Sequence, residues 1–209
     1  MLQNEFFERN LLYKLHDFTN HYMLSEIQQG KIAHLFNVLD SNKNGELQIV
    51  DFVDVSEAII AHLGWKSGDR EAQLLLRKAS RLFIQLLIDI DEPEMTISFH
   101  DWMRFFEKEI EAEEESGLLY YYVHRINLHL FTLFDLNKDN YIQLNEYANM
   151  LSVYKVSDTE CKKSFDALDT NKDGQISRSE LIQGLDDFFR SPKENVPGNW
   201  IFGDWKSPE

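Results

Sequence analysis

Apolar positions recur every three or four residues along most of the chain, and this spacing predicts a protein built from helices. The clearest example is the stretch 71–90, whose apolar face comprises Leu74, Leu75, Ala79, Leu82, Phe83, Leu86 and Leu87. Ser25 is placed as an N-cap, and Ser157 with Glu160 forms a capping box. We expect an all-α fold with helices over 25–39, 52–63, 71–90 and 118–134, a helix after Ser157, and a last helix that ends near Phe189.

Residues 1–22 also carry an amphipathic pattern, with apolar side chains at Phe6, Leu11, Leu12, Leu15 and Phe18. We expect a helical extension over 1–24 that covers the core. A membrane-binding or partner-binding helix is the alternative for the same pattern.

Short polar segments interrupt the helical pattern, and the segment 169–180 carries regularly spaced oxygen side chains. Those at loop positions 1, 3, 5 and 12 are Asp169, Asn171, Asp173 and Glu180. Gly174 at position 6 permits a sharp turn with φ > 0, and Ile176 at position 8 is apolar. A hard cation such as Ca²⁺ takes six to eight oxygens at about 2.3–2.6 Å, which this spacing can supply.

The segments 40–51 and 135–146 repeat this arrangement, so the sequence predicts three Ca²⁺ sites. The candidate ligands are Asp40, Asn42, Asn44, Glu46 and Asp51 in the first loop, Asp135, Asn137, Asp139, Tyr141 and Glu146 in the third, and Asp169, Asn171, Asp173, Gln175 and Glu180 in the fourth. Asn140 replaces glycine at position 6 of the third loop, and asparagine enters the left-handed region readily. We therefore expect the third loop to keep its metal.

Asp51 replaces the usual glutamate at position 12 of the first loop and is one methylene shorter. A single oxygen contact from this side chain would leave about six ligands, the number that Mg²⁺ requires. We expect the first site to discriminate least between Ca²⁺ and Mg²⁺ and to hold Mg²⁺ in a resting cell. The alternative is that the exiting helix shifts and Asp51 binds Ca²⁺ with both oxygens.

The segment 89–101 reads as a damaged copy of the same loop. Aligning Ile97 with position 8 puts Asp101 at position 12, but Ile90 at position 1 and Met95 at position 6. Because the first ligand and the turn glycine are both missing, we predict that this second loop binds no metal. Ile97 keeps a structural task, which is to pair with Leu47 across a short two-stranded ladder.

Each of the four units also has a large apolar residue after position 12, and three loops follow a Phe-x-x-(Leu or Phe)-Asp pattern. These features, with Gly174 and Glu180, resemble the EF-hand calcium-binding family. The silent second loop, Asn140, Asp51, and the tail Pro197–Gly203 resemble the sarcoplasmic calcium-binding proteins, calerythrin and calexcitin. The resemblance implies EF-hand pairs over 25–112 and 113–190 and a tail over 191–209, whereas the extension over 1–24 departs from the pattern of these proteins. It places Trp200 and Phe202 of the tail between the two lobes.

Composition narrows the possible partners. The formal net charge is −15, which argues against binding to nucleic acid, and no apolar run is long enough to span a bilayer. The single cysteine, Cys161, rules out an intramolecular disulfide and fits a reducing compartment. We expect a cytoplasmic monomer whose ligands are calcium ions, without a signal peptide.

Three functions remain open. The first is a Ca²⁺ buffer, which the 15 phenylalanines against five methionines favour, because the grooves of calcium sensors are rich in methionine. The second is a sensor that exposes an apolar groove to a protein partner. The third is a scaffold that holds an apolar ligand between its lobes, as in luciferin-binding proteins and photoproteins. An enzyme is not expected, because the seven histidines are scattered and form no zinc-spaced cluster with cysteine.

Overall fold

The computed structural model describes residues 23–112, 117–152 and 156–206, and within them the chain is helical, as predicted. The helices are α2 (Glu26–Leu39), α3 (Ile49–His62), α4 (Arg70–Ile90), α5 (Phe99–Glu111), α6 (Leu118–Phe134), α7 (Leu144–Ser152), α8 (Asp158–Leu168), α9 (Arg178–Arg190) and the 3₁₀ helix η1 (Pro197–Trp200). The start of α3 lies three residues before the predicted one, because the helix begins inside the first loop. The predicted helix over 1–22 lies outside the described residues.

Two short antiparallel ladders join the loops in pairs. The strands β1 (Glu46–Leu47) and β2 (Ile97–Ser98) place Leu47 opposite Ile97, which confirms the predicted pair. The strands β3 (Tyr141–Gln143) and β4 (Gln175–Ser177) place Ile142 opposite Ile176. All four of these side chains are fully buried, so each ladder joins two loops through one apolar contact.

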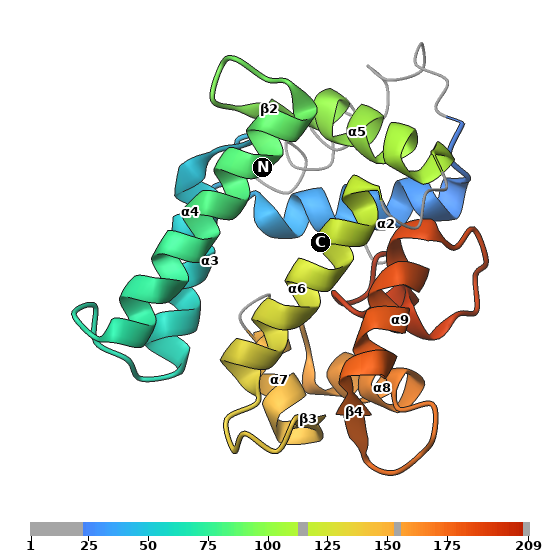
Figure 1. The fold of residues 1–209 in the computed structure, drawn as a ribbon. Coiled ribbons are helices and arrows are strands. Elements are labelled where there is room, and N and C mark those ends of the chain that lie inside the picture. The colour runs from blue at the N-terminus through green and yellow to red at the C-terminus, as the bar shows by residue number, and fades with distance from the viewer. Residues whose placement is uncertain (1–22, 113–116, 153–155, 207–209) are drawn as a thin grey trace, which may run out of the picture.

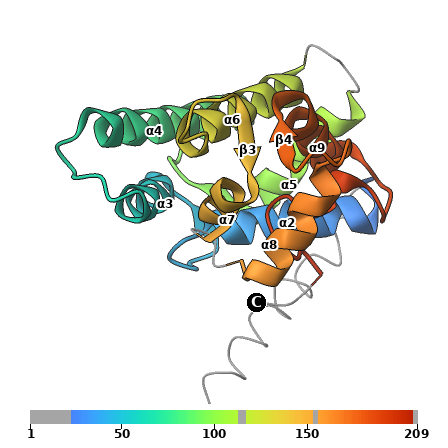
Figure 2. The same ribbon diagram turned by 90° about the horizontal axis from the view of Figure 1, so that it is seen from below.

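The two loop pairs lie at opposite ends of the molecule, and the helices between them form its core. In Figure 1, α6 lies between α4 and α9. Figure 2 shows α4 and α6 in one layer, with α2 and α3 in another. None of the described helices has the length and apolar character needed to cross a membrane.

Local capping explains where several helices begin. Ser25 and Gln28 form a capping box at α2, and Ser157 and Glu160 form the predicted one at α8. At α9 the box uses Ser177 and Glu180, so the last residue of the fourth loop also fixes the first turn of the helix that leaves it.

The C-terminal tail packs against both halves of the molecule. Ile201 and Phe202 are buried, and Phe202 lies edge-on to Phe188 of α9 with ring centroids 5.0 Å apart. His34 Nε2 of α2 lies 2.9 Å from the backbone oxygen of Phe202. Of the two aromatic residues expected to pack between the lobes, Phe202 is buried and Trp200 is only half-buried, and Ile201 between them is fully buried.

A fully buried lysine joins α2 to the C-terminal end of α9. Lys31 Nζ donates hydrogen bonds of 2.9 Å to the backbone oxygens of Asp187 and Ser191 and to Asn199 Oδ1 of the tail. A cation is favoured at this position because the last carbonyls of a helix carry partial negative charge. Burial lowers the pKa of Lys31 to about 8, and the Asp187 carboxylate acts against this shift.

Candidate metal centres

The fourth loop folds back on itself through its own oxygen side chains. The Asp169 carboxylate accepts hydrogen bonds from the backbone N–H groups of Asp173 at 3.1 Å and Gly174 at 2.9 Å. Glu180 Oε1 accepts one from Thr170 N at 3.0 Å, which brings position 12 back to the start of the loop. Partial burial raises the pKa of Glu180, but hydrogen bonds from Ser177 and Thr170 outweigh it and hold that pKa below its usual value.

The third loop repeats this pattern. Asp135 accepts from Asp139 N at 3.1 Å and Asn140 N at 3.0 Å, and Glu146 Oε1 accepts from Leu136 N at 2.9 Å. Asn140 takes a left-handed φ of 68°, as its replacement of glycine required. The loop therefore keeps the turn despite the substitution.

The first loop also repeats the pattern, with the shorter carboxylate at its end. Asp40 accepts from Asn44 N at 3.2 Å and Gly45 N at 2.9 Å. Asp51 Oδ1 accepts from Ser41 N at 3.1 Å and Oδ2 from Gln48 N at 2.8 Å. The shorter aspartate therefore makes the same backbone contacts in this loop that glutamate makes in the third and fourth loops.

The residues at positions 3, 5 and 7 complete each ring. In the first, third and fourth loops the position 3 side chain accepts from the position 5 N–H, and the position 5 side chain accepts from the position 7 N–H, at 2.8–3.0 Å. The acceptors are Asn42, Asn44, Asn137, Asp139, Asn171 and Asp173. The position 7 residues, Glu46, Tyr141 and Gln175, begin the ladder strands, where a backbone carbonyl is the oxygen that EF-hand geometry uses.

A lysine at position 4 is a shared feature that the sequence interpretation missed. Lys43, Lys138 and Lys172 have left-handed φ angles of 58°, 62° and 60°. Their recurrence at the same loop position was the available signal, although lysine has no special preference for this backbone conformation.

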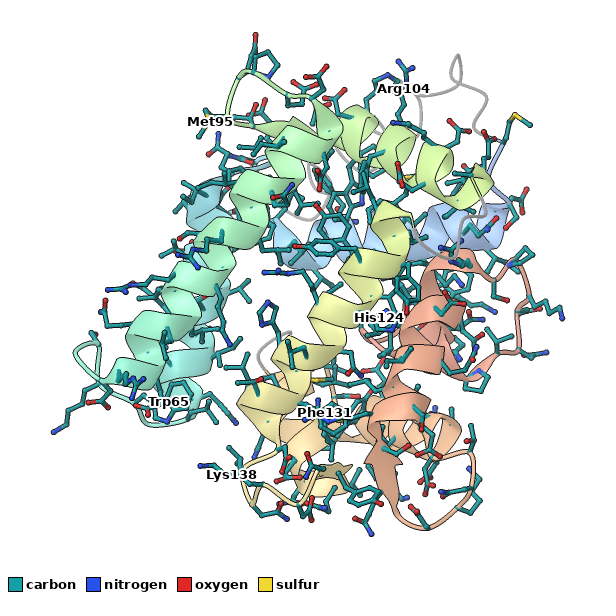
Figure 3. The ribbon with its side chains drawn as sticks, viewed as in Figure 1. Trp65, Met95, Arg104, His124, Phe131 and Lys138 are labelled. Atoms are coloured by element: carbon teal, nitrogen blue, oxygen red, sulfur yellow. The ribbon has the colours of Figure 1, made fainter. Side chains whose placement is uncertain are left out.

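The second loop lacks the closing contacts. Asp101 bonds to Ser98 at the start of α5, and no described hydrogen bond joins it to the beginning of the loop. Asp89 instead accepts from Gln85 Nε2 at 2.9 Å and from the Tyr122 hydroxyl of α6 at 2.6 Å. Met95 nevertheless keeps a left-handed φ of 60° at the glycine position. Figure 3 shows Met95 and Lys138 of the third loop at opposite ends of the molecule.

The donor sets of loops one, three and four fit a hard cation. Each carboxylate or amide oxygen has two lone pairs, so the oxygens at positions 1, 3 and 5 that accept one N–H retain a lone pair for a metal. The position 12 oxygen that reaches back to the start of the loop accepts two or three hydrogen bonds, and it must exchange some of them for the cation. Across the described ranges, no three His, Cys, Asp or Glu side chains gather closely enough to hold an ion by themselves. A cation in these loops therefore needs the asparagine amides and backbone carbonyls as well.

A separate apolar cavity of about 180 Å³ lies between the two halves. Its wall comes from both EF-hand pairs and the tail and includes Phe52, Leu82, Trp102, Tyr122, Leu130, Phe189 and Phe202. Three polar side chains besides Tyr122 also line it: Ser56, Lys78 and His129. The Ser56 and Tyr122 hydroxyls have partners, whereas His129 Nε2 is buried without one.

Comparisons with known proteins agree with these loops. Residues 129–186 match the EF-hand domain pair. Luciferin-binding protein of Renilla reniformis is 27% identical over 156 residues, which span 74% of this chain and 80% of that protein. Calerythrin of Saccharopolyspora erythraea is 25% identical over 167 residues, 79% of this chain and 94% of that protein. A sarcoplasmic calcium-binding protein from amphioxus shares the fold, with a TM-score of 0.70 and 18% identity over 87% of this chain and 98% of that one.

Proposed function

Because the chain is an EF-hand calcium-binding protein, similar to calerythrin, sarcoplasmic calcium-binding protein and luciferin-binding protein, we propose that it is a Ca²⁺ buffer with three active sites. The shared hydrogen-bond pattern of loops one, three and four supports these sites. The second loop binds no metal in this proposal, because the Asp89 carboxylate is hydrogen-bonded to Gln85 and Tyr122 and the Asp101 carboxylate to Ser98. The protein acts by binding and not by catalysis.

The docked tail is the observation that favours a Ca²⁺ buffer over a Ca²⁺ sensor. Phe202 lines the cavity between the halves, and contacts from both halves hold the tail in place. Lys31 and His34 bond to it from α2, and Ser164 Oγ of α8 donates to the Trp200 carbonyl at 3.0 Å. A sensor would have to break these buried contacts to expose its groove, at a cost of about 1–3 kcal/mol for each polar group left unpaired.

Calorimetric titration tests the number of sites. We expect three Ca²⁺ per chain, and Glu180→Gln should weaken one of them because it removes a carboxylate from the fourth loop. Glu57→Gln, on the exposed face of α3, is the matched control and should leave all three unchanged. Binding of a fourth ion, or an unchanged titration for Glu180→Gln, would contradict the assignment.

A neutral apolar dye, N-phenyl-1-naphthylamine, tests the buffer role. We expect its fluorescence to fall or stay low when Ca²⁺ is added, because the tail already covers the apolar surface. A large rise on adding Ca²⁺ would instead identify a sensor that opens a groove for a protein partner.

A second candidate function is the binding of a small apolar ligand between the lobes. It is supported by the cavity and by the buried His129 Nε2 that faces no partner, together with the similarity to luciferin-binding protein. Ligand sites in proteins are commonly apolar pockets with a few polar groups, as this cavity is.

A further inference from the structure

An open groove adjoins the apolar cavity between α4 and α6. The groove has a volume of about 330 Å³ and is lined by Arg81, Leu82, Ile84, Gln85, Tyr121 and Arg125. Leu82 also lines the apolar cavity, so the two spaces share a wall. The cavity alone, at about 180 Å³, is smaller than the roughly 300–1,000 Å³ typical of sites for drug-sized ligands. An occupant of ordinary size would therefore need more room than the cavity offers, and the groove on the other side of Leu82 is the adjoining space.

Three cationic side chains line these two spaces. Arg81 and Arg125 line the groove, and Lys78 lines the cavity. None of them forms an ion pair with a carboxylate in the described part of the chain. The carboxylate of Asp89, one turn beyond Gln85, accepts from Gln85 and Tyr122 and from neither arginine.

Among the described residues, these three cations lack carboxylate partners although the molecule carries a net negative charge. The chain has 36 acidic and 21 basic residues, so carboxylates are abundant as partners for cations. The guanidinium of Arg125 instead lies 5.1 Å from the centroid of the Tyr121 ring, which orients it over the groove wall. An arginine fork held in this way presents N–H donors that match a carboxylate.

Apart from Lys78, the side chains that line the cavity carry no charge at neutral pH. Burial, with the nearby charges of Lys78 and Arg125, lowers the pKa of His129 to about 4. At neutral pH the imidazole is therefore uncharged, and the rest of the cavity wall is largely apolar. The cavity suits a hydrocarbon chain, and the groove suits an anion.

We propose that the space between α4 and α6 binds a small amphipathic acid, with its carboxylate between Arg81 and Arg125 and its apolar chain in the cavity beside Leu82. This inference rests on the second candidate function and specifies the ligand class. Charge complementarity distinguishes such a ligand from a neutral apolar one, because a neutral ligand would gain nothing from the paired arginines.

The test is calorimetric titration of the full, Ca²⁺-loaded chain with decanoate and with 1-decanol, which have the same chain length. Decanoate should bind at least tenfold more tightly. The double variant Arg81→Gln/Arg125→Gln should remove this difference while decanol binding stays the same. Arg70→Gln/Arg77→Gln is the matched control, because it changes two exposed arginines of α4 that line neither space, and it should keep the difference.

The same titrations distinguish failure of the acid site from failure of the apolar-ligand function. Equal binding of decanoate and decanol, unaffected by the Arg81/Arg125 variant, would overturn the acid site and leave the apolar-ligand function standing. Absence of binding by both would overturn both proposals. Ca²⁺ titration of each variant verifies that the protein is folded, so loss of decanoate binding cannot be attributed to misfolding.

Discussion

Asp51 shows how one missing methylene is accommodated in a loop that keeps its pattern. Its carboxylate reaches the N–H groups of Ser41 and Gln48, as Glu180 reaches those of Thr170 and Ser177. The side chain is fully buried. The shorter side chain makes equivalent contacts, so the ring of atoms that it closes is smaller by one methylene.

A smaller ring should change the ion preference of the first site. Mg²⁺ takes six ligands at about 2.0–2.1 Å, whereas Ca²⁺ takes six to eight at longer distances. The first loop also has only two acidic side chains among its position 1, 3, 5 and 12 ligands, Asp40 and Asp51. We expect this site to have the lowest Ca²⁺/Mg²⁺ selectivity of the three, and Asp51→Glu to raise its preference for Ca²⁺.

Competition titration with millimolar Mg²⁺ measures this preference. The third and fourth loops, which keep glutamate at position 12, serve as internal controls. If Mg²⁺ displaced Ca²⁺ from those two loops but left the first one untouched, the selectivity argument would be wrong.

At the scale of elements, helices and loops were predictable because their signals are local. A helix needs only a run of apolar positions and a cap, and a loop needs oxygens at fixed spacing. The start of α3 was misplaced because the helix begins with Ile49 and Val50, which remain exposed, before the buried face begins at Asp51 and Phe52. Ile49 and Val50 are apolar but exposed, so they do not continue the buried apolar face from which the start of the helix was predicted.

The contacts between elements were not predictable from the same signals. Lys31 reads as one charged residue of an amphipathic helix, yet it is fully buried against the carbonyls that end α9. The apolar cavity and the cations beside it combine α4 and α6, which are separated in the sequence by the second loop and α5. Such contacts depend on how helices cross, and neither apolar period nor loop spacing encodes that.

At the scale of the whole molecule, the tail depends on a close approach between two glycines. A Cβ added at Gly198 of η1 would lie 1.9 Å from the backbone oxygen of Gly184 in α9, closer than any side chain can come. A Cβ at Gly184 would meet Leu168 at 2.3 Å. Glycine at position 198 therefore allows the tail to lie directly on α9, the helix that leaves the fourth loop, and glycine at position 184 makes room for Leu168 of α8.

Gly198→Ala should displace the tail and uncover the cavity. The added methyl group collides with backbone and not with a flexible side chain, so the tail must move, and overpacking of this kind costs about 1–3 kcal/mol. Asn199, Ile201 and Phe202 follow in the chain and would lose part of their burial. We expect a lower midpoint of thermal unfolding in Ca²⁺ and a higher fluorescence of N-phenyl-1-naphthylamine than in the unmodified protein.

Gly68→Ala is the matched control, because a Cβ at Gly68 meets nothing within 4 Å. It should leave both the unfolding midpoint and the dye fluorescence unchanged. A Gly198→Ala protein that matched this control in both measurements would mean that the close contact of η1 with α9 does not hold the tail in place. The docked tail would then no longer favour a buffer over a sensor, because the tail would tolerate displacement from α9 without a measurable cost.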